Sequence, residues 1–204
     1  MSQVKVTGNA SGTGTLTIAA PNTNSDYTLT LPTNTGTILT SATTTGFPAG
    51  SVLQVLQAVK TDVFSTNSTT FVDVTGLSVS ITPSSATNKI LVLMDVKLGS
   101  QTNVSNYVKL VRGSTSIYIG DAAGSRQRAT YANADDPSNE WAYQGVGIYL
   151  DSPNTTSATT YKVQMLSEVA VNLGTVYLNT QGDDTDDNQH ERLASSITVM
   201  EIAA

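Results

Sequence analysis

Apolar and polar residues alternate along most of the chain after residue 50. This period of two is the pattern of a β-strand with one buried face. With turn residues between them, strands are predicted in residues 51–64, 71–84, 88–100, 106–121, 140–154, 159–171, 174–181 and 193–204. The Leu, Gln and Ala content of the first of these segments leaves a helix as its alternative.

Several segments carry a more specific signal. The run KILVLMDVKLGS is the most apolar, which predicts a central strand buried on both faces near Leu91 to Met94. Residues 71–84 predict two short strands, and residues 112–114 predict the turn of a hairpin. Gly145 and Gly147 lie inside a predicted strand, where they indicate a bulge or the close approach of another backbone.

Together these segments predict about eight or nine strands and no amphipathic helix of three turns. The final strand, at the C-terminus, is expected to lie inside a sheet. We therefore predict an all-β fold, an antiparallel β-sandwich of jelly-roll type in residues 47–204. An up-and-down barrel is the alternative, which the uneven loop lengths disfavour.

The first 46 residues differ from the rest. They are rich in Thr, Asn and Gly, and they contain strand-like stretches but too few large apolar residues for a core. We predict an extended β-arm, ordered by contacts outside itself, that serves attachment and intertwining. Phe47 begins the second domain, as an anchored pivot or as part of a flexible linker. The residues expected to carry the assembly contacts of the arm are Leu16, Ile18, Leu29, Leu31 and Phe47.

Composition excludes several classes of function. The chain has 204 residues, 13% of them charged, and a net charge of -6 without a basic patch, which argues against nucleic-acid binding. It has no cysteine and hence no disulfide or thiolate chemistry. No apolar stretch approaches the roughly eighteen residues of a membrane-spanning helix. The N-terminus lacks the pattern of a classical signal peptide.

Catalytic chemistry has little support in the sequence. A Ser-His-Asp site would have to be built around the single histidine, His190, and no GxSxG motif is present. Asp135, Asp136 and Glu140 lie near Trp141, which is the basis for a glycan-cleaving alternative. We favour solvated loops in both cases and predict a protein that is not an enzyme.

The acidic loop GDDTDDNQHE is the best candidate for a metal site. Asp184, Asp186 and Asn188 match the first three ligand positions of an EF-hand loop. Gln189 then stands where the loop needs glycine, and Ser195 where it needs glutamate. We therefore predict no bound metal and no cofactor.

The segment GTGTLTIAAPNTNSDYTLTLPTNTGTILTS resembles a segment common in tailed-phage fibre and other virion proteins. The following FPAGSVLQVLQAVK and the closing ITVMEIAA resemble the β-rich module of such proteins, and the likeness is strongest in residues 12–95. The resemblance implies a homotrimer, attached to the virion by its N-terminal part and displaying its C-terminal domain. It defines no catalytic residues.

The resulting hypothesis is a short tail fibre that binds a host surface glycan or protein and contacts other virion proteins. The alternative is a capsid decoration protein whose arm laces across capsid subunits, and a minor alternative is a glycan depolymerase. Loops 121–140 and 181–191 are long and polar, as expected of loops that face a host. The residues expected in host contact are Arg126, Arg128, Tyr131, Trp141, Asp183 and His190.

Overall fold

The computed structural model describes residues 11–13, 47–133, 140–168, 174–182 and 184–204. The chain divides into two units, Met1–Ile38 and Leu39–Ala204, and all the described strands lie in the second. The predicted arm contacts at Leu16, Ile18, Leu29 and Leu31 lie outside the described residues, as do Asp135, Asp136 and Asp183.

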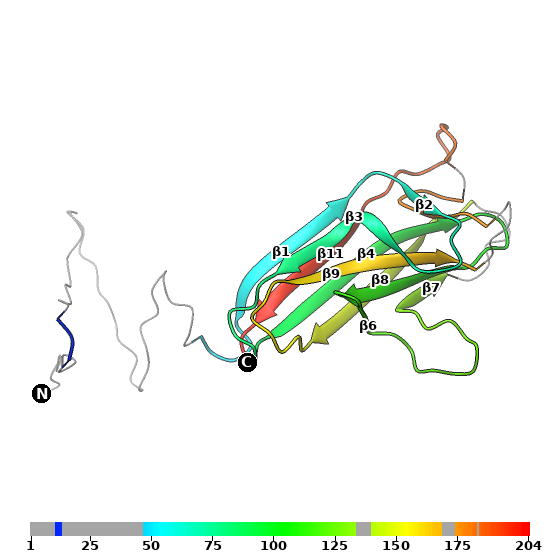
Figure 1. Cartoon of the computed structure of the whole chain (residues 1–204). Coiled ribbons are helices and arrows are strands. Elements are labelled where there is room, and N and C mark those ends of the chain that lie inside the picture. The colour runs from blue at the N-terminus through cyan, green and yellow to red at the C-terminus, as the bar shows by residue number, and fades with distance from the viewer. Residues whose placement is uncertain (1–10, 14–46, 134–139, 169–173, 183) are drawn as a thin grey trace, which may run out of the picture. The chain divides into compact units, whose positions relative to one another are not determined.

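One of the two sheets, sheet A, has six strands (Figure 1). Its order is β1-β11-β4-β10-β2, and β8 pairs with β4 on the side opposite β11. The C-terminal strand β11 thus lies inside the sheet, as predicted. The bounds are β1 Val52–Lys60, β2 Phe64–Thr66, β4 Lys89–Ser100, β8 Tyr143–Asp151, β10 Val176–Leu178 and β11 Ser195–Ile202.

The second sheet, sheet B, has five strands. Its order is β3-β9-β5-β6, and β7 also pairs with β5. Every pairing in both sheets is antiparallel. The bounds are β3 Val72–Ile81, β5 Asn106–Arg112, β6 Thr115–Ile117, β7 Tyr131–Asn133 and β9 Thr159–Ser167.

The core lies between the two sheets. Along β4 every second side chain from Ile90 to Leu98 is buried, and along β9 Tyr161, Val163 and Met165 are buried against them. Because successive side chains of a strand point to opposite faces, this alternation places one face of each sheet in the core. The predicted all-β antiparallel sandwich is confirmed, and no helix occurs in the described residues.

The structure corrects several details. The segment 71–84 forms one strand, β3, because the backbone absorbs an irregularity between Asp73 and Ser78 in which Gly76 adopts a φ of +84°. The helix alternative for residues 51–64 is wrong, since this segment pairs with β11. The polar connection 122–140 contains the short strand β7.

The glycines of β8 make room for side chains, and not for the bulge or the second backbone that the sequence predicted. A Cβ on Gly145 would lie 2.7 Å from the Tyr131 ring, and one on Gly147 would lie 3.2 Å from the Thr130 methyl group. The segment 130–131 therefore packs directly on the backbone of β8. This contact fixes one end of the loop that connects β6 and β7.

Two buried carboxylates tie distant strands together. Asp151 of β8 accepts hydrogen bonds from Arg112 Nη1 at 2.8 and 2.9 Å and from the Tyr161 hydroxyl at 2.6 Å, which links sheet A to sheet B. Burial and the bond to Asp151 raise the pKa of Tyr161. Glu201 of β11 accepts hydrogen bonds from Gln54, from Asn88 and from the backbone and hydroxyl of Ser84, at 2.6–2.8 Å.

Candidate functional site

The outer face of sheet A is apolar at two of its edge strands, β8 and β1. On β8 the side chains of Val146, Ile148 and Leu150 are 51%, 56% and 53% exposed. On β1 Val52, Val55 and Val59 are exposed to a similar degree, between 51% and 56%. Exposed apolar side chains are ordinary when they occur singly, but six on one sheet face form a patch.

The strand register places some of these side chains in common rows. Leu91 of β4 stands between Leu150 of β8 and Met200 of β11, which in turn faces Val55 of β1. Leu93 stands beside Ile148 in the next row. We use the name apolar face for the set Val52, Val55, Val59, Leu91, Leu93, Val146, Ile148, Leu150, Met200 and Ile202.

Polar side chains interrupt the apolar face: Thr198 stands beside Leu93, and Asp95 stands beside Val146. Asp95 forms an ion pair with Lys97 on the same strand. Gln144 of β8 donates its side-chain amide to Asp95 at 2.9 Å. The face therefore has an apolar end, near Val52 and Leu150, and a polar end.

The outer face of sheet B is polar by contrast. Asp73 accepts hydrogen bonds from Lys162 at 2.7 Å and from Gln164 at 2.8 Å, and these bonds lower its pKa. The hydroxyls of Ser80 and Thr160 lie 2.6 Å apart. A solvated antiparallel sheet normally has this polar outer face, whereas apolar residues on both faces are typical of a sheet that is covered on both sides.

The apolar outer face of sheet A can be compared with the prediction that β4 is buried on both faces. Val92 and Met94 are buried in the core, as expected. Leu91 and Leu93 are only half-buried, because none of the described residues covers the outer face above them. The expectation of burial on both faces is therefore only half met in the described part of the chain.

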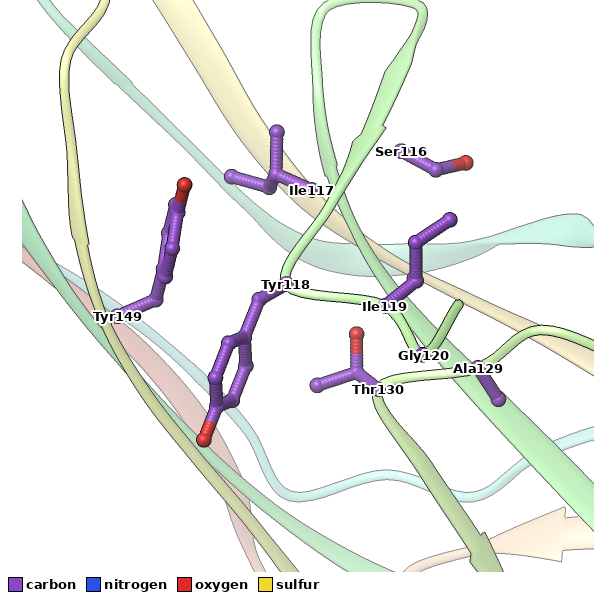
Figure 2. Close-up of a pocket in the computed structure, with 8 residues that line it drawn as sticks. All are labelled: Ser116, Ile117, Tyr118, Ile119, Gly120, Ala129, Thr130 and Tyr149. Carbon is purple, nitrogen blue, oxygen red and sulfur yellow. The ribbon is translucent and has the colours of Figure 1, made fainter. Parts of the chain in front are cut away.

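A pocket opens at a different place, beside the loop after β6 (Figure 2). Its volume is about 720 Å³. The Tyr118 and Tyr149 rings stack there with their centres 5.3 Å apart. The pocket is lined by Ser116, Ile117, Tyr118, Ile119, Gly120, Ala129, Thr130 and Tyr149.

Hydrogen bonds hold the base of this loop in place. Arg128 donates its Nε hydrogen to the carbonyl oxygen of Gly120 at 2.6 Å. Thr130 donates its backbone N–H to the Val108 carbonyl at 2.8 Å, and its hydroxyl oxygen accepts the N–H of Leu110 at 2.9 Å. The residues between Gly120 and Ala129 are exposed.

The predicted host-contact residues occupy different environments. Arg126 and Arg128 are exposed on the loop after β6, and Trp141 is 61% exposed before β8. Tyr131 is half-buried on Gly145, so its ring contributes mainly to packing. His190 is half-buried, and its Nδ1 lies 2.6 Å from a carboxylate oxygen of Asp187.

The two predicted loops meet at Gln181. Its side-chain amide donates to the carbonyl oxygen of Glu140 at 2.6 Å and lies 3.4 Å from that of Gln189. The structure thus brings the segment next to Trp141 and the segment next to His190 together.

We call the pocket lined by Tyr118 and Tyr149 the tyrosine pocket. The sequence did not predict it, because nothing but these two aromatic residues marks it there.

The acidic loop forms ion pairs. Asp184 pairs with Arg192 at 2.6 Å, and a hydrogen bond to His190 lowers the pKa of Asp187. Asn188 is exposed beside them. Within the described part of the chain, no three His, Cys, Asp or Glu residues gather as a metal site would require.

No protein-family model matches the chain, and no curated protein matches it. Among the described residues there is no helix of the length and hydropathy needed to cross a membrane.

Proposed function

We propose that this protein is a non-enzymatic structural protein of a tailed-phage virion, a short tail fibre. In this proposal the N-terminal arm attaches to the particle. The β-domain assembles with two further copies of the chain and binds the host surface through its loops. The resemblance of residues 12–95 to virion proteins supports the class of protein.

The fold supports the same class. Strand order β1-β11-β4-β8 in sheet A, opposite β3-β9-β5-β6 in sheet B, is consistent with a jelly roll, an architecture common in viral structural proteins. Phe47, the proposed pivot, is half-buried and precedes the turn that leads into β1. The N–H of Gly50 donates to the Ala203 carbonyl at 2.8 Å. This bond joins the segment before β1 to the residue that follows the last strand, β11.

The observation that carries the proposal is the apolar face. Complete burial of a Val, Leu or Ile side chain contributes about 1.5–3 kcal/mol, so covering the exposed half contributes about 1 kcal/mol. The six half-exposed side chains on β1 and β8 therefore offer about 6 kcal/mol per copy. The partner we propose is another copy of the chain, and in a ring of three the β1 side of the face in one copy would contact the β8 side of the next.

The size of the face also suits self-association. Four adjacent strands spaced about 4.8 Å apart, with about eight residues each at about 3.3 Å, cover about 500 Å². In a ring of three copies this face would be divided between two neighbours, and the three contacts together would bury about 1,500 Å². The proposal of three copies per assembly rests on the resemblance to virion proteins that form homotrimers.

Two measurements test the proposal. Sedimentation equilibrium of the purified chain should give three times the mass of 21.3 kDa, and a stable monomer would refute assembly. Antibodies against the chain should label the tail in electron micrographs of the virion. Label on the head would instead support the capsid decoration protein, and a chain missing from particles would refute both.

A further inference from the structure

The tyrosine pocket lies at an open edge of the sandwich, between β8 of sheet A and β6 of sheet B. The Tyr149 side chain points to the inner face of sheet A, as does that of Val92, its partner on β4. It packs partly against the core. Ile117, buried at the end of β6, belongs to the same core. The floor of the pocket is thus rigid core, whereas its rim is the exposed loop 120–129.

Tyr118 is held in an unusual backbone conformation. Its φ is +51°, in the left-handed region that bulky residues rarely adopt, at a cost of roughly 1–3 kcal/mol. The ring is nevertheless 46% exposed, stacked on Tyr149 and not buried in the core. Such strain persists where the surroundings impose it, and it is concentrated at ligand sites.

The lining combines flat apolar surface with hydroxyl groups. The rings of Tyr118 and Tyr149 lie side by side, with the Thr130 side chain next to Tyr118 (Figure 2). The Thr130 oxygen accepts a backbone N–H, which leaves its own hydrogen to donate. Ser116 adds a second hydroxyl to the lining. The volume of about 720 Å³ lies in the range of small-molecule sites.

We propose that this pocket binds a pyranose sugar, with the C–H face of the ring on Tyr118 and the sugar hydroxyls bonded to Ser116 and Thr130. A pyranose has one apolar face and a polar edge, which matches this lining. The inference rests on the proposed function, because it assigns the host-surface glycan to a site.

The charge beside the pocket bears on whether a charged or a neutral sugar would bind there. Arg128 donates a hydrogen bond to the carbonyl oxygen of Gly120, which lines the pocket. In a chain with a net charge of -6 this cation at the pocket wall favours a uronic acid over a neutral sugar.

The test uses the purified full-length chain and amide chemical shifts measured by NMR. The probes are methyl glucoside, methyl N-acetylglucosaminide and methyl glucuronide, titrated separately. We expect saturable shifts at Ser116–Gly120 and Ala129–Thr130, larger for the glucuronide at equal concentration. Saturable shifts confined to other residues, or none with any of the three sugars, would overturn the proposal.

Matched variants locate the contact. Tyr118→Ala should weaken sugar binding at least tenfold, and Tyr118→Phe should change it less than threefold, because the phenyl ring keeps the stacking surface. Trp141→Ala is the control, since Trp141 is an exposed aromatic residue just before the other end of β8, which lies roughly 20 Å from Tyr149 along the strand. Binding that survives Tyr118→Ala but not Trp141→Ala would contradict the assignment. A negative result in these sugar titrations would not change the outcome expected for the mass in solution or for the location in the virion, which test the proposed function separately.

Discussion

Ile148 in the middle of the apolar face offers the sharpest test of assembly. Its side chain is 56% exposed in the single chain, so Ile148→Glu should change the stability of the monomer by less than about 1 kcal/mol. In an assembly that covers the face, the change removes about 1 kcal/mol of apolar burial per copy. It also forces an unpaired carboxylate out of water, which costs several kcal/mol more for each copy.

The expected result is loss of the oligomer without loss of the fold. The apolar contribution alone, about 3 kcal/mol over three copies, lowers the association constant about a hundredfold. Sedimentation equilibrium should therefore show a monomer at concentrations where we expect the wild type to be a trimer. Circular dichroism should show the same β spectrum and a similar melting temperature for the monomeric fold.

Ser78→Glu is the matched control on sheet B. Ser78 lies on the polar outer face, opposite Lys162 in the register, so a new carboxylate meets a cation and water. This variant should keep the wild-type mass. An Ile148→Glu chain with the wild-type mass would refute the apolar face as the contact between copies, whereas a change of mass in both variants would show only a general effect of charge.

Three further predictions concern the stability of the domain. Asp151→Ala should lower the free energy of unfolding by about 3–5 kcal/mol in urea titrations, because it leaves Arg112 beside the core without its partner; an effect below 1 kcal/mol would contradict this. Burial raises the pKa of Glu201, but its hydrogen bonds outweigh burial and lower this pKa below the ordinary value of 4.5. Ionised Glu201 therefore stabilises the folded state above pH 4.5, and this stabilisation is lost as the pH falls. Unfolding measured from neutral pH downward should therefore show a steeper loss in the wild type than in Glu201→Gln, and parallel curves would refute it. Gly145→Ala should cost about 1–3 kcal/mol by thermal melting, and more than the same change at Gly147, whose neighbours lie farther away.

The strands could be predicted because their pattern is local. A period of two fixes which side chains enter the core, and it located β1, β4, β8, β9 and β11 in the sequence. The break expected within residues 71–84 did not occur, since Gly76 permits a conformation that keeps one strand continuous. The strand β7 is only three residues long, too short for the pattern to be detected.

The candidate sites were harder to predict because they depend on contacts between distant segments. Tyr131 looked like a displayed aromatic residue, but the missing side chain of Gly145 gives its ring a place to pack. The acidic loop looked like possible metal ligands, but Arg192 pairs with Asp184. The tyrosine pocket requires β6 and β8 to meet at one edge, which only the sheet order provides.

The strand β8 links the two proposals. Ile148 points outward into the apolar face, and Tyr149, the next residue, points inward and lines the pocket. Contact between copies on one side of β8 would restrain the strand that carries a pocket wall on the other. A site that holds a single sugar ring has few contacts and binds weakly, but three copies joined at their apolar faces would present three such sites to one surface. Simultaneous binding raises the overall affinity by orders of magnitude without any new contact. On this reasoning the apolar face would serve host attachment as well as folding, because it would convert three weak sugar sites into one strong attachment.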